Sequence, residues 1–128
     1  MNWATVKEQL TVGNQYQITD FYSRKAFQVV YTGGEMHAEV ECASPMDTAV
    51  YKELFGGEFN YSKRPVLIQL SGTLIAASLQ GEPHGEDTVT ANDMAGHACL
   101  FFDGSLSHVG SLPDTEHIRQ VYIAAGRS

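Results

Sequence analysis

The sequence predicts a mainly β fold with one or two helices, an α+β arrangement being the alternative, and three observations support this. Two pairs of apolar or alternating segments are joined by short polar turns, as in β-hairpins. A segment with helix start and stop signals lies between the two pairs, and another ends the chain. The strands outnumber the helices, which indicates a β-rich sandwich or a barrel-like sheet with helices packed against it.

The first hairpin is predicted over residues 15–31. Residues 15–20 alternate polar with apolar side chains, and residues 26–31 are rich in β-branched and aromatic ones. The preceding residues 6–12 have no clean period, and we expect a short strand or a turn there. Residues 35–42 alternate again, which places His37, Glu39 and Glu41 on one face of a strand. We expect that face to be exposed to solvent.

A helix is predicted at about 45–56. The Ser44 hydroxyl suits the cap, Pro45 suits the first helical position, and Asp47 complements the positive end of the helix. Two glycines beginning at Gly56 end it. The expected buried stripe consists of Ala49, Val50, Leu54 and Phe55.

The second hairpin is predicted from residues 65–70 and 73–79, which flank Ser71 and Gly72. A two-residue connection of this kind is a strong hairpin signal. Both segments are apolar enough to lie in the middle of a sheet. A loop over 81–94 follows, and then a short apolar strand at 99–102.

A C-terminal helix is predicted at about 114–125. Its apolar face is expected to carry Ile118, Val121 and Tyr122. His117 has charged neighbours in the sequence, so we expect it at a solvated surface position.

Length and charge limit the classes of function. The 128 residues fit a single domain over 1–128, and a formal charge of −7 argues against a nucleic-acid partner, which needs a basic face. No segment is long enough for a transmembrane helix, and the first residues do not resemble a signal peptide, so we expect a soluble chain. Two cysteines do not form a disulfide framework, and Cys42 is expected to be a small buried residue.

Residues 81–108 contain the groups best suited to catalysis. Cys99 is the candidate nucleophile, because a histidine beside a thiol takes its proton and lowers its pKa. His97 and Cys99 project from the same face if this segment is extended. His84 follows an apolar strand in a tight turn. Gly96 permits a close approach by substrate, and the backbone amides of Ala98 and Cys99 are candidates for an oxyanion hole.

The Pro-His-Gly at 83–85, followed by Gly-His-Ala-Cys-Leu at 96–100, resembles the signature of the L,D-transpeptidase (YkuD-like) catalytic domain. That family has an upstream His-Gly and a downstream Ser/Thr-His-Gly-Cys, followed by an apolar residue and usually Arg. Here Phe101 stands where the family usually has that Arg.

The resemblance implies a β-rich sandwich with a helix alongside and acyl transfer on peptidoglycan stem peptides through a cysteine acyl-enzyme. It assigns Cys99 as nucleophile, His97 as general base and His84 as the group that orients substrate or tunes the thiol. Gly85, Gly96 and Ala98 would line the substrate. No cofactor is implied, and as part of a longer exported protein the domain would act in the cell envelope or be secreted.

Two alternatives remain open. The first is a zinc-dependent cell-wall peptidase, since zinc accepts histidine, carboxylate and thiolate ligands. Its candidate ligands are His37, Asp47 and His97. The second is a catalytically inactive cell-wall-binding module. Its aromatic surface would consist of Tyr16, Tyr22, Tyr31, Phe59 and Tyr61.

Overall fold

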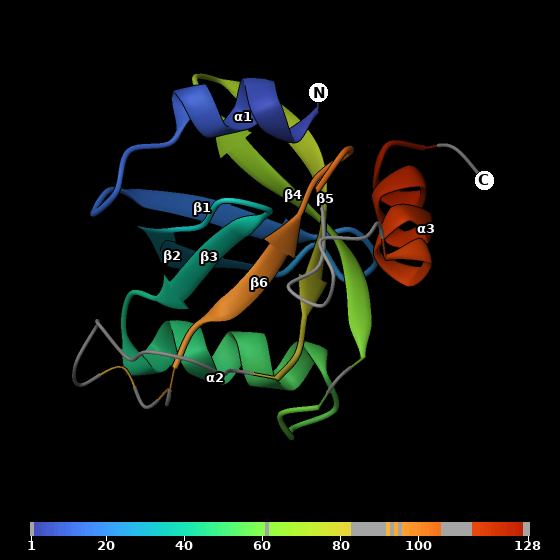
Figure 1. Cartoon of the computed structure of the whole chain (residues 1–128). Helices are drawn as coiled ribbons and strands as arrows, with labels where there is room; N and C mark the ends of the chain where they lie inside the picture. Colours follow the sequence, from blue (N-terminus) through green and yellow to red (C-terminus); the bar gives the residue numbers. More distant parts are fainter. Residues whose placement is uncertain are drawn as a thin grey trace.

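Six antiparallel strands close into a barrel in the order β1-β2-β3-β6-β5-β4 (Figure 1). The computed structural model describes residues 2–60, 62–82, 92, 94, 96–105 and 114–126. The strands are β1 (Gln15–Asp20), β2 (Ala26–Gly33), β3 (Ala38–Cys42), β4 (Lys63–Leu70), β5 (Thr73–Gln80) and β6 (Ala98–Phe101). Pairing of β4 with β1 closes the barrel. The predicted mainly β fold with a barrel-like sheet is therefore confirmed.

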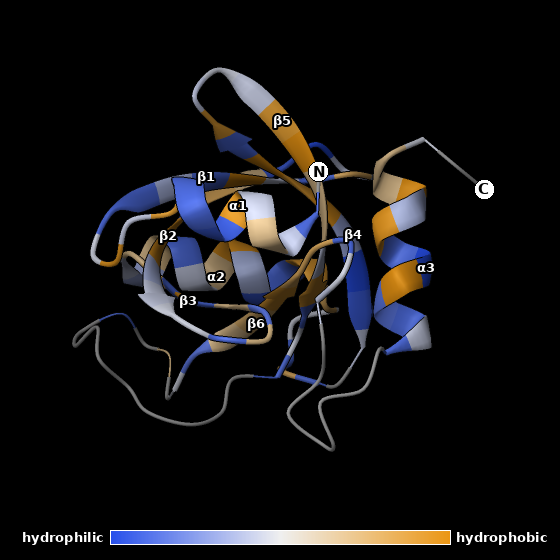
Figure 2. Cartoon of the chain, turned by 45° about the horizontal axis from the view of Figure 1, so that its top comes forward, coloured by the Kyte–Doolittle hydropathy of each residue, from blue (hydrophilic) through white to orange (hydrophobic). Residues whose placement is uncertain are grey.

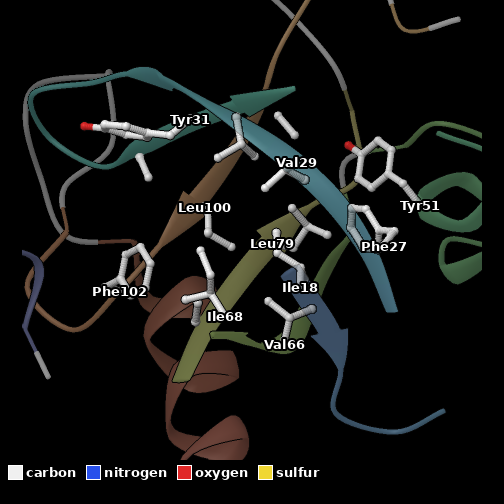
Figure 3. Packing of buried hydrophobic residues seen from close by; sticks show 14 of the residues in the cluster. Ile18, Phe27, Val29, Tyr31, Tyr51, Val66, Ile68, Leu79, Leu100 and Phe102 are labelled. Carbon is white, nitrogen blue, oxygen red and sulfur yellow. The ribbon is translucent and has the colours of Figure 1, made fainter. Parts of the chain in front are cut away.

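Alternate residues of every strand fill the barrel interior. Figure 3 shows Ile18, Val29 and Leu100 pointing into it, together with side chains from the remaining strands. Successive side chains of a strand point to opposite faces, so the intervening residues lie on the outer wall. Cys42 is buried in this interior cluster, as expected from the sequence.

The described part of the chain forms three helices outside the barrel: α1 (Trp3–Gln9), α2 (Pro45–Leu54) and α3 (Thr115–Ala124). α1 and α2 lie at opposite ends of the barrel, and α3 lies against the outer wall formed by β4 and β5 (Figure 1). Figure 2 shows hydrophobic and hydrophilic residues interspersed along α3. The helices predicted at about 45–56 and 114–125 are both present.

The N-terminal segment corrects one expectation, because α1 occupies much of the region expected to be a short strand or turn. The Asn2 side chain accepts a hydrogen bond from the Thr5 amide and so caps the helix. Trp3 and Val6, three residues apart, are buried on one side of it. The indole Nε1–H of Trp3 donates to the Glu35 carbonyl at 2.8 Å, which ties α1 to the segment before β3.

The buried stripe of α2 also differs from the expectation. Leu54 and Phe55 are buried as predicted, but Ala49 is exposed and Val50 is only half-buried. Tyr51 takes the central position, where its hydroxyl donates to the Gln80 carbonyl at 2.7 Å. That hydrogen bond satisfies the one polar atom of the ring, so the whole side chain packs at the end of the barrel.

The hairpins β1–β2 and β4–β5 are both present, the second with Ser71 and Gly72 at positive φ as its turn. The strand expected over 35–42 is shorter, because β3 begins at Ala38. Gly34 bends the chain before it, with φ +117°.

We expect Gly34→Ala to destabilise the protein by at least about 1 kcal/mol more than Gly33→Ala, measured by urea unfolding. Both glycines have positive φ, which L side chains rarely adopt. A Cβ on Gly34 would also lie 2.0 Å from the His37 carbonyl oxygen, whereas one on Gly33 meets nothing within 4 Å. Equal losses in the two variants would show that the backbone relieves this overlap at no cost.

Candidate functional site

Strand β6 carries Cys99 on the outer wall of the barrel. Its neighbours Ala98 and Leu100 belong to the interior cluster, so Cys99 and Phe101 face outward. His97, directly before the strand, is two residues from Cys99, and Gly96 before it has the positive φ (+101°) that glycine adopts most readily. Cys99 is nevertheless only 2% exposed and His97 8%.

Strand β3 brings Glu39 to the same place. The antiparallel register of β3 with β6 pairs Ala38 with Leu100, Glu39 with Cys99 and Val40 with Ala98. Oε1 of Glu39 lies 3.5 Å from Nε2 of His97. The structure therefore gathers Glu39, His97 and Cys99 on one patch of outer wall, here called the β3–β6 patch.

The Cys99 thiol is protonated in this arrangement. Burial raises the pKa of Cys99 to about 12, and the Glu39 carboxylate adds to the increase. The sequence-based expectation was a pKa lowered by a histidine, which is the opposite direction. Burial also raises the pKa of Cys42 to about 12. The Cys42 thiol faces the barrel interior, whereas Cys99 faces outward. The two cysteines thus differ in their neighbours and hardly at all in burial.

None of the remaining candidates of the transpeptidase-like motif is placed by the structure on the outer wall beside Cys99. The side chain of Ala98 lies in the interior cluster, and its backbone pairs with Val40 in the sheet. His84 and Gly85 lie outside the described residues.

The structure does not bring the alternative zinc ligands together. Asp47 lies in the first turn of α2, where its carboxylate accepts hydrogen bonds from the Gln28 amide at 2.9 Å and the Ser44 hydroxyl at 2.7 Å. His37 lies beside the far end of β6, against Phe101. Within the part of the chain that the structure describes, no group of three or more His, Cys, Asp or Glu residues is arranged to hold a metal ion.

The aromatic residues expected for a binding module do not share one surface. Tyr31 is buried in the interior cluster, while Tyr16 and Phe59 are half-buried against it. Tyr22 is exposed at the turn after β1, beneath the Arg64 guanidinium. Tyr61 lies outside the described residues.

Next to the β3–β6 patch lies a stack of three rings that the sequence analysis does not predict. Phe101 lies between His37 and His117, with ring centroids 4.3 Å and 3.6 Å away. Nδ1 of His117 is hydrogen-bonded to the Ser78 hydroxyl at 2.6 Å. These side chains are buried, and so is that of Glu41 on β3. The burial corrects the expected solvated position of His117 and the exposed face expected for His37 and Glu41.

The residue spacing of α3 indicates that His117 is buried. His117, Val121 and Ala124 are four and three residues apart, so they share one helix face, and all three are buried. The expected apolar face included Val121 but also Tyr122, which is exposed. The buried face of α3 therefore includes the polar residues His117 and Gln120 and excludes Tyr122.

No protein-family model, curated protein or solved structure matches this chain. None of the helices in the described ranges is both long and apolar enough to cross a membrane.

Proposed function

We propose that the protein catalyses cysteine-dependent acyl transfer or hydrolysis, with Cys99 as the nucleophile and His97 as the base. The observation that supports this best is the β3–β6 patch itself. A thiol, an imidazole and a carboxylate share one face of two paired strands, and the imidazole and carboxylate lie 3.5 Å apart. Rigid strands hold such groups more precisely than loops do.

The raised pKa of Cys99 determines how the reaction begins. Because the resting thiol keeps its proton, attack on a carbonyl must be coupled to proton transfer from Sγ to His97. The S–H bond breaks, an S–C bond forms, and the leaving group departs with the proton that the imidazolium returns. Water or an amine then attacks the thioester carbonyl, the C–S bond breaks, and Sγ regains a proton through His97. Attack by water gives hydrolysis and attack by an amine gives transfer.

Peptidoglycan stem peptides are the proposed substrate class. This part of the proposal depends on the motif at 83–85 and 96–100, in which His84 would orient the acyl donor near the thiol. The corresponding site of action is the cell envelope. A cell-wall-binding module without catalysis is the competing outcome, and the following experiment separates the two.

We expect Cys99→Ala to lower acylation of the protein by at least about 100-fold. The probes are p-nitrophenyl acetate and stem tetrapeptides released from peptidoglycan, with intact-mass spectrometry reporting the acyl-enzyme. Cys42→Ala is the matched control, because burial raises the pKa of both thiols to about 12. Only Cys99 has His97 and Glu39 beside it, so Cys42→Ala should keep near wild-type acylation.

Three results would contradict the proposal. The first is equal loss in the two variants, which would indicate unselective thiol chemistry. The second is wild-type protein that no probe acylates at Cys99. The third is acylation by the ester but not the tetrapeptides, which would remove the substrate class and leave the nucleophile in place. Circular dichroism of each variant confirms that the barrel is intact.

A further inference from the structure

We propose that Glu39 is a positioning residue for His97, so that Cys99, His97 and Glu39 work as a cysteine–histidine–glutamate relay on the β3–β6 patch. The inference rests on the proposed function and assigns a third member to its site. It depends on the register between two strands that are far apart in the sequence.

The position of Glu39 is determined by the sheet. Ala38 and Val40 on either side of it point into the interior, so the Glu39 side chain is held on the outer wall. The antiparallel register places it directly across from Cys99. Residues directly opposite one another in antiparallel strands have Cβ atoms about 4.5–5.5 Å apart, so both side chains lie within reach of a common partner.

The contact with His97 is largely shielded from water. The side chains of His97 and Glu39 are 11% and 22% exposed, and Nε2 of the ring faces the carboxylate at 3.5 Å. A carboxylate this close to Nε2 stabilises the imidazolium once the ring has taken the thiol proton.

Glu39 has opposite effects on the two other members of the relay. Its charge disfavours the Cys99 thiolate, since it contributes to the raised pKa of that thiol. The same charge stabilises the imidazolium that forms when His97 takes the thiol proton during attack. A carboxylate here therefore opposes a resting thiolate and assists only when the proton moves from sulfur to the ring. The two effects lead to experimental changes of opposite sign.

The test compares Glu39→Gln and Glu39→Asp in the Cys42→Ala background, where Cys99 is the only thiol. Ultraviolet thiolate absorbance, measured against pH, reports the ionisation of Cys99, and p-nitrophenyl acetate reports the rate of acylation. In Glu39→Gln we expect the thiol to ionise at lower pH while acylation slows about tenfold or more. Glu39→Asp, which keeps the carboxylate on a shorter side chain, should fall between Glu39→Gln and the parent.

Glu35→Gln is the charge control. Glu35 lies just before β3, and its exposed side chain pairs with Lys7 at 3.7 Å, so the variant also loses one negative charge and one ion pair. It should change neither measurement. A carboxylate with a merely structural role would not shift thiol ionisation and acylation in opposite directions.

The outcomes separate this inference from the proposed function. If Glu39→Gln raises the acylation rate together with the thiolate fraction, or leaves acylation unchanged, the positioning role is wrong and Cys99 remains the nucleophile. If the Cys42→Ala parent is not acylated at all, the proposed function fails and the positioning role fails with it.

Discussion

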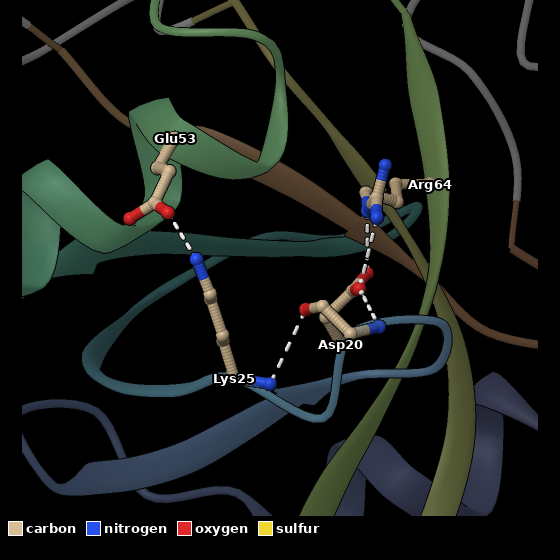
Figure 4. Close-up of polar contacts among 5 residues, drawn as sticks. Asp20, Lys25, Glu53 and Arg64 are labelled. Atoms are coloured by element: carbon tan, nitrogen blue, oxygen red, sulfur yellow. Dashed lines mark hydrogen bonds and ion pairs between the residues drawn. The ribbon is translucent and has the colours of Figure 1, made fainter.

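Asp20→Ala is expected to lower the free energy of unfolding by about 2–4 kcal/mol. Asp20 ends β1 and is fully buried. It accepts hydrogen bonds from Nε and Nη2 of Arg64 at 2.5 and 3.0 Å and from the Ser23 amide at 2.7 Å (Figure 4). Without the carboxylate the guanidinium loses its counter-charge and the turn loses its acceptor. The Arg64 side chain is 27% exposed, so water offsets part of the loss.

A second ion pair in the same region supplies the control. Lys25 and Glu53 also form an ion pair (Figure 4), but both side chains are exposed. Glu53→Ala should therefore cost less than about 1 kcal/mol in the same urea titration at neutral pH. Equal losses in Asp20→Ala and Glu53→Ala would mean that burial does not strengthen the Asp20–Arg64 pair.

The Asp20–Arg64 pair should also have a pH dependence of known sign. Burial by itself would raise the pKa of Asp20, but hydrogen bonds from Arg64 and Ser23 outweigh burial and hold the pKa below its usual value. A carboxyl group with a lowered folded-state pKa stabilises the fold above the unfolded-state pKa of about 3.9. The stability difference between wild type and Asp20→Ala should thus be constant near neutral pH and shrink as the pH falls below that value.

Local signals account for the parts of the fold that the sequence predicts correctly. The Ser71–Gly72 turn and the Ser44 cap are each encoded within a few residues of the element they define. Closure of the barrel is different, because it pairs Ile18 with Ile68 and Ala38 with Leu100. No short-range pattern specifies which apolar strands become neighbours, and a sandwich or an open sheet would have the same alternation.

The candidate site likewise has one part that local sequence predicts and another that depends on tertiary structure. Placement of His97 and Cys99 on one face follows from strand alternation alone. Glu39 could be associated with them only after the pairing of β3 with β6 was known. The direction of the Cys99 pKa also depends on tertiary structure, because burial outweighs the effect expected from a nearby histidine.

The expected surface position of His117 is wrong for a related reason. Its residue type and charged sequence neighbours favour the surface, but stacking on Phe101 and the hydrogen bond to Ser78 make a buried position favourable. Val121 and Ala124, which follow it by four and seven residues, are also buried. At this position helix periodicity is a better guide than polarity.

The buried His117 should make the stability of the protein depend on pH between about 3 and 6.5. Burial lowers the pKa of His117 to about 3; Asp114 raises it, while Lys63 and His37 add to the decrease. The unfolded chain binds a proton at this histidine below about pH 6.5, and the folded chain does not. Stability is therefore complete above pH 6.5 and falls with decreasing pH, by about 1.4 kcal/mol for each unit, until the pH reaches the folded-state pKa.

His117→Asn removes the titrating ring while placing an amide near the position of Nδ1. Urea unfolding between pH 7 and 4.5 should show a weaker pH dependence in this variant than in wild type, with the difference concentrated below pH 6.5. Ser78→Ala is the matched control, since it removes the partner at 2.6 Å but leaves the imidazole buried against Phe101. It should lower stability by about 1 kcal/mol at every pH and keep the wild-type slope. Parallel pH profiles for wild type and His117→Asn would mean that the ring has the same pKa in the folded and unfolded chains, which contradicts its burial between α3 and the barrel wall.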